Sequence, residues 1–86
     1  MAVVKLFYRE EKFIERLEPG MTGEKGVLVL DDERKTATMY FVPTATLVEK
    51  RTAERLAQNI CKVGFVLKNG VRIGVGNILE IKSRTN

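Results

Sequence analysis

Only one segment of the chain has the periodicity of an amphipathic helix, and this limits the folds open to it. Over residues 50–63, apolar side chains recur at intervals of three and four, which gives one apolar stripe. Thr46 and Glu49 have the spacing of a capping box, and Gly64 follows the segment, as glycine often does past a helix. We expect the regular helix to begin near residue 50, because Leu47 would fall opposite the stripe.

The remaining segments have the character of short strands. Residues 36–42 alternate polar and apolar side chains, which is the pattern of a half-buried strand. Residues 12–17, KFIERL, are too few to distinguish helix from strand, and a hairpin return onto residues 3–9 favours a strand. The expected strands are 3–9, 12–17, 27–31, 36–42, the runs GFVLK and VRIGV on either side of Asn69-Gly70, and 78–82.

The order of these elements predicts the fold class. No βαβ unit is repeated, so the sheet should be largely antiparallel, with the helix packed on one of its faces. We therefore expect an α+β protein of about five to seven strands, built from hairpins and a C-terminal meander. A chain of 86 residues fits a single domain over residues 1–86, which buries a little over ~60% of its unfolded surface.

The segment KNGVRIGVGN, residues 68–77, contains three glycines and two cations. A phosphate-binding loop is one interpretation, but a dinucleotide fingerprint must open a helix and a Walker loop needs Ser or Thr after GK. Asn69-Gly70 instead predicts a two-residue type I′ hairpin turn, which would place Phe65 opposite Gly74. In that register the core face carries Val66, Val71, Ile73 and Val75, and the outward face carries Phe65, Leu67, Arg72 and Gly74. Gly76-Asn77 would form the next turn.

The residue types that are missing exclude several kinds of chemistry. The sequence has no histidine and one cysteine, which removes most zinc sites, Ser-His and Cys-His catalysis, and an intramolecular disulfide. Cys61 is expected to be a small buried hydrophobe. The acidic run 31–33 lacks the spacing of a calcium loop, so we interpret it as a solvated turn. We expect no catalytic residues, no cofactor and no metal.

The sequence also bears on the cellular location of the protein. No apolar run approaches the ~20 residues that a membrane-spanning helix needs, so we expect no membrane association. Residues 1–10 contain Lys5 and no long apolar run, so they resemble a strand rather than a signal peptide. A single cysteine is typical of a cytoplasmic protein.

The net charge of +4 is unevenly distributed. Residues 1–43 carry seven Lys/Arg and eight Asp/Glu, whereas residues 44–86 carry eight Lys/Arg and three Asp/Glu. Such asymmetry favours a polyanionic partner for the second half, although a small positive charge also keeps a domain soluble.

The expected helix places part of this charge on one side. With the apolar stripe turned inward, Arg51, Arg55 and Lys62 lie on the outward side, and arginine binds phosphate bidentately. Arg72 beside an exposed Phe65 would resemble an RNA-binding sheet, in which bases stack on aromatic rings. A plain solvated face, with Phe65 covered by another strand, is the alternative. The predicted RNA-binding residues are Arg51, Arg55, Lys62, Lys68, Arg72, Phe65, Lys82 and Arg84.

The stretch VPTATLVEKRTAERLAQNICKVGFVLKNGVRIGVGN resembles the small, basic, one-domain proteins of archaeal thermophiles, several of which are ribosomal or ribosome-associated. The resemblance covers residues 42–77 and includes no diagnostic motif. It implies a structural role bound to RNA, with contacts from Arg51, Arg55 and Lys62. The acidic residues of the first half depart from this class and leave room for a surface that faces a protein.

We therefore predict a non-catalytic RNA-binding protein, a structural component of the ribosome or associated with it. The alternative is a protein-interaction module without a nucleic-acid role. In that case an open sheet edge or an apolar face would bind a partner protein or a second copy of the chain.

Overall fold

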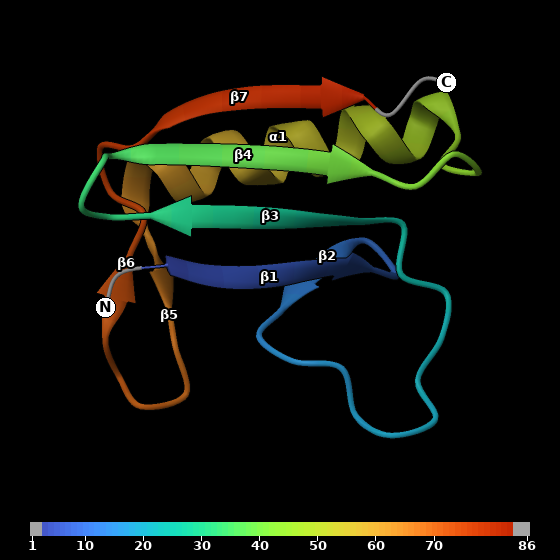
Figure 1. Ribbon diagram of the computed structural model, residues 1–86, viewed down its shortest axis with the longest axis horizontal. Coiled ribbons are helices and arrows are strands. Elements are labelled where there is room, and N and C mark those ends of the chain that lie inside the picture. Colours follow the sequence, from blue (N-terminus) through green and yellow to red (C-terminus); the bar gives the residue numbers. More distant parts are fainter. Residues whose placement is uncertain (1–2, 84–86) are drawn as a thin grey trace.

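The computed structural model of the protein describes residues 3–83 and has an α+β fold (Figure 1). It contains a five-stranded sheet, a separate two-stranded sheet and one helix within this range, which confirms the predicted class. The elements are β1 (Val3–Arg9), β2 (Lys12–Ile14), β3 (Gly26–Asp31), β4 (Thr36–Phe41), α1 (Leu47–Val63), β5 (Phe65–Val66), β6 (Arg72–Ile73) and β7 (Ile78–Ser83). The strand interpretation of residues 12–17 is thus confirmed for their first half.

The five-stranded sheet has the order β2-β1-β3-β4-β7. Its first three pairings are antiparallel, as predicted, but β7 pairs in parallel with β4. The prediction of a C-terminal meander is therefore wrong, because β7 does not continue the β5–β6 hairpin. Parallel strands need a long crossover, and α1 supplies it between β4 and β7. This pairing sets Leu79 beside Ala37 and Ile81 beside Met39, so that β7 extends the apolar face of the sheet.

The core lies between α1 and one face of the five-stranded sheet. Figure 1 shows α1 crossing behind β4 and β7, in agreement with its contacts to both strands. Every second residue of β1, β3 and β4 points toward the helix, and α1 contributes a stripe of small and branched side chains. The buried residues of this layer are Leu6, Tyr8, Phe13, Leu28, Leu30, Ala37, Met39, Phe41, Ala53, Ala57 and Ile60.

The start of α1 is fixed by its cap rather than by its apolar stripe. The Thr46 hydroxyl accepts a hydrogen bond from the Glu49 N–H at 3.1 Å, and the Glu49 carboxylate accepts one from the Thr46 N–H at 2.8 Å. This capping box is as predicted, but it begins the helix at Leu47, three residues earlier than expected. Leu47 is 64% exposed, because the cap satisfies the first turn without burying it.

The β5–β6 hairpin has a different register from the one predicted. Phe65 pairs with Ile73 and Val66 with Arg72, and the Leu67 N–H donates to the Val71 carbonyl at 2.8 Å. The loop therefore has three residues, 68–70, and the shift of one residue turns each side chain on β5 to the other face. This register packs Phe65 and Leu67 against the core together with Ile73, which removes more apolar surface from water than the predicted valines would.

The predicted core face of this hairpin is mostly exposed. Of its four residues only Ile73 is buried, whereas Val66, Val71 and Val75 are exposed. Gly74 does not lie opposite Phe65 either. Its φ of +95° and the 3.0 Å that would separate an added Cβ from Ile60 Cγ2 explain why this position is glycine.

Asn77 joins the β3–β4 turn to the start of β7. Its side-chain N–H groups donate to the Thr36 carbonyl at 2.9 Å and to Asp32 Oδ1 at 3.3 Å. Asp32 Oδ1 also accepts from the Gly74 N–H at 3.2 Å. Asp32 therefore holds two distant turns together, and the interpretation of the acidic run 31–33 as a merely solvated turn is incomplete.

Candidate nucleic-acid interface

The exposed side of α1 carries a line of three cations, which we call the basic stripe: Arg51, Arg55 and Lys62. At about 100° per residue, these three positions fall within roughly 40° of each other around the helix axis. The buried Ala53, Ala57 and Ile60 face the opposite direction. The stripe extends about 16 Å along the axis, at a rise of about 1.5 Å per residue. The sequence prediction of an outward basic face on this helix agrees with this geometry.

The charges of the basic stripe are not neutralised by neighbouring carboxylates. All three side chains are exposed, and none forms an ion pair with another residue in the range 3–83. Arg51 and Arg55 are four residues apart, so they repel each other by roughly 0.2–0.5 kcal/mol. An anion that bridges them would remove this cost.

Arg72, by contrast, is used by the fold. Its Nη1 donates to the Val63 carbonyl at 2.6 Å, so the guanidinium satisfies a carbonyl at the C-terminal end of α1. Its aliphatic part packs over the backbone of Gly64. The sequence predicts Arg72 beside an exposed Phe65, but the observed register does not bring these two side chains to the same face.

Phe65 is half-buried and packs against the hydrophobic core. It pairs with the buried Ile73 rather than with Gly74. The ring therefore does not form the exposed stacking platform that the sequence predicts next to Arg72.

Two of the three other predicted residues, Lys68 and Lys82, do not extend the basic stripe. Lys68 has an exposed side chain. Its backbone N–H donates to Glu15 Oε1 at 2.8 Å, which ties the loop 68–70 to the segment after β2. Figure 1 shows the β5–β6 hairpin extending past β1, away from α1. Lys82 lies on the sheet face opposite α1, since it alternates with Ile81, and forms a 3.8 Å ion pair with Glu80. Arg84 lies outside the described residues.

A second surface is not predicted by the sequence: the sheet face that α1 does not cover, which we call the open face. A row of residues crosses all five strands there: Ile14, Phe7, Val27, Tyr40 and Lys82. Val3 and Ile78 on the same face are 53% and 73% exposed. The alternation within residues 3–9 and 36–42 indicates two faces, but only the structure shows which of them packs against α1.

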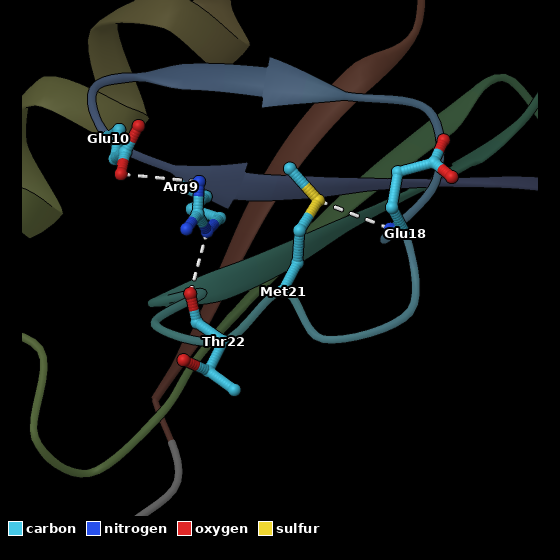
Figure 2. Close-up of polar contacts among 5 residues, drawn as sticks. All are labelled: Arg9, Glu10, Glu18, Met21 and Thr22. Carbon is cyan, nitrogen blue, oxygen red and sulfur yellow. Dashed lines mark hydrogen bonds and ion pairs between the residues drawn. The ribbon is translucent and has the colours of Figure 1, made fainter.

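Arg9 lies at one end of the open face and is also used by the fold (Figure 2). Its Nε donates to the Thr22 carbonyl at 2.6 Å, and its Nη1 lies 3.2 Å from a Glu10 carboxylate oxygen. In the same loop, the Glu18 N–H points to the Met21 sulfur at 3.1 Å. The bond from Arg9 to Thr22 fastens the segment between β2 and β3 to the end of β1, so Arg9 serves to hold a loop.

Two side chains in or beside the core, Tyr8 and Cys61, have raised pKa values. Burial raises the pKa of Tyr8, and the negative charges of Glu11 and Glu49 raise it further. Burial likewise raises the pKa of the Cys61 thiol, which packs at the margin of the core, as predicted. A raised thiol pKa disfavours the nucleophilic thiolate.

The described residues offer neither a clustered metal site nor a membrane-spanning helix. Residues 3–83 contain no group of three or more acidic or cysteine side chains placed to hold a metal ion. Within the same range, α1 lacks the length and apolar character needed to span a bilayer.

Comparison with known proteins gives no match. No protein-family model fits the chain, and neither a curated protein nor a solved structure is significantly similar to it.

Proposed function

We propose that the protein binds RNA through the basic stripe of α1. The observation that carries the proposal is the alignment of Arg51, Arg55 and Lys62 on the exposed side of the helix, without ion-pair partners in residues 3–83. Within the stripe, the arginine forks can each hold two phosphate oxygens, whereas lysine provides a point charge. The exposed Lys68 would add a more distant contact.

The mechanism is phosphate neutralisation without catalysis. When cations replace the counterions around a phosphate backbone, the released ions favour binding, and the affinity falls as salt is added. We propose ribosomal RNA as the partner because the resemblance inferred from residues 42–77 implies it; no family model and no curated protein matches the chain.

A filter-binding titration with fragments of ribosomal RNA at low and moderate salt tests this proposal. The wild-type protein is expected to bind at low salt, and the triple variant Arg51→Glu, Arg55→Glu, Lys62→Glu is expected to lose binding. Far-ultraviolet circular dichroism would show that the variant stays folded, because all three side chains are exposed.

A matched control changes the net charge equally at another place. Lys5, Lys12 and Arg16 are exposed cations on or near β1 and β2, and their reversal to Glu lowers the charge by the same amount. The control variant should keep most of the affinity. Equal losses in both triple variants would show a diffuse charge effect, and absence of binding by the wild type at low salt would contradict the proposal.

A second candidate function is protein interaction through the open face. The exposed apolar side chains of Val3, Tyr40 and Ile78 on this face favour it. In this case Tyr40→Glu should abolish binding of the protein partner and leave any RNA affinity unchanged. An equal loss of partner binding in the triple basic-stripe variant would contradict this second candidate.

A further inference from the structure

The two edges of the five-stranded sheet differ in what they offer to another strand. β2 forms one edge and is only three residues long. β7 forms the other edge with six residues, and in the described part of the chain it pairs only with β4. Figure 1 shows β7 as the outermost strand on its side of the sheet. A long edge of this kind presents unpaired backbone groups to another chain.

One hydrogen bond shows which backbone groups of β7 point outward. The Ile78 N–H donates to the Lys35 carbonyl, next to β4, at 2.8 Å. Because backbone groups alternate in direction along a strand, Glu80 and Lys82 also turn theirs toward β4. The N–H and C=O groups of Leu79, Ile81 and Ser83 therefore point away from the sheet.

We propose that β7 pairs in antiparallel fashion with β7 of a second copy, with Ile81 at the two-fold axis. In this register Ile81 forms a hydrogen-bonded pair with Ile81 of the second copy. On either side of this pair, Leu79 of one copy forms a hydrogen-bonded pair with Ser83 of the other. All the outward backbone groups of β7 then find partners, and the two sheets become one continuous sheet.

The charges of β7 select this register. Glu80 comes to lie opposite Lys82 of the second copy, and the symmetry repeats the pair. These are non-hydrogen-bonded positions, where opposing Cα atoms approach to about 4.5 Å and side chains are closest. Moving the two-fold axis by one residue along β7, which slides the two strands by two residues, would set Glu80 opposite Glu80, or Lys82 opposite Lys82.

The apolar residues of β7 agree with this pairing. Ile81 is on the α1 side of the sheet and 39% exposed, so the helix leaves part of it uncovered. At the two-fold axis the two Ile81 side chains would lie on the same face and cover each other. Directly opposed residues share a face, so both α1 helices lie on one side of the dimer. Their basic stripes then face the same way, although the pairing itself does not depend on RNA binding.

Sedimentation equilibrium of the nuclease-treated protein, over a range of concentrations, tests this proposal. The wild-type average mass is expected to rise from one chain to two. Glu80→Lys sets a lysine opposite Lys82 in both symmetry-related pairs, and Lys82→Glu sets a glutamate opposite Glu80 in both. Each variant should therefore dimerise about tenfold more weakly than the wild type.

A mixture of the two variants provides the decisive control. Glu80→Lys in one chain faces Lys82→Glu in the other, so the mixture should dimerise about as well as the wild type. Repulsion within each chain persists in the mixture, so recovery can come only from pairing between chains. Lys12→Glu, on the opposite edge strand, should dimerise normally. A wild type that stays monomeric, assembles beyond two copies, or is insensitive to both variants would overturn the proposal.

Discussion

The two regions predicted to contact RNA, α1 and the β5–β6 hairpin, use their cations differently. On α1, the basic stripe is exposed and has no ion-pair partners in residues 3–83. On the hairpin, Arg72 donates to the Val63 carbonyl and Phe65 packs into the core, so both stabilise the fold. An exposed cation is therefore available for binding RNA only where its side chain does not already form a contact that stabilises the fold.

The reason lies in how each element determines which side a residue faces. Along a helix, the direction of a side chain follows from its position in the sequence, because the turn angle is nearly constant. Along a strand, the two faces exchange if the register shifts by one residue. A prediction of the outward residues is therefore more secure for α1 than for β5 and β6.

Replacing Phe65 gives the largest expected loss of stability in this comparison. Phe65→Ala should lower the free energy of unfolding by about 2 kcal/mol, less than for a fully buried ring, because Phe65 is half-buried. Urea denaturation measures this change. Val66→Ala, next to it on the exposed side, should change stability by no more than about 0.5 kcal/mol. A stable Phe65→Ala variant with lost RNA affinity would instead support the stacking role predicted from the sequence.

Replacing Arg72 should have a smaller effect. Arg72→Met keeps much of the aliphatic contact with Gly64 but removes the hydrogen bond to the Val63 carbonyl. The expected loss is about 1 kcal/mol in thermal or urea unfolding. If Arg72 contacts phosphate instead, the variant would unfold like the wild type and bind RNA with a reduced dependence on salt.

Much of the fold could be predicted because it depends on local patterns. The capping box at Thr46, the end of the helix at Gly64 and the period-two pattern of β4 all appear in the structure. The crossover to β7 could not be predicted, because a parallel pairing next to β4 depends on how α1 packs. The apolar Leu79 and Ile81 fit several partner strands equally well in the sequence.

Two turns show where local signals fail. Asn69-Gly70 is a strong hairpin signal, yet its loop has three residues, because burial of Phe65 and Leu67 sets the register. In contrast, Glu10 and Glu11 both adopt positive φ in the two-residue turn between β1 and β2. No turn-forming residue marks that place in the sequence. Tertiary packing of the strands overrides the cost, which is about 1–2 kcal/mol per residue for the left-handed region.

In the candidate site, too, some features follow from the local sequence and others depend on tertiary contacts. The basic stripe could be predicted from helical spacing alone, since Arg51, Arg55 and Lys62 recur at intervals that share one side. The roles of Arg72 and Arg9 could not, because their partners, the Val63 and Thr22 carbonyls, are backbone groups that carry no signal in the sequence.

The salt dependence of RNA binding tests the central claim most directly. The slope of log affinity against log salt should be measured for the wild type and for Arg51→Gln, Arg55→Gln, Lys62→Gln. Three lost phosphate contacts should make the slope shallower by about 2 for single-stranded RNA, at roughly 0.7 per contact. An unchanged slope in the variant would show that the basic stripe does not contact phosphate and would contradict the proposed function.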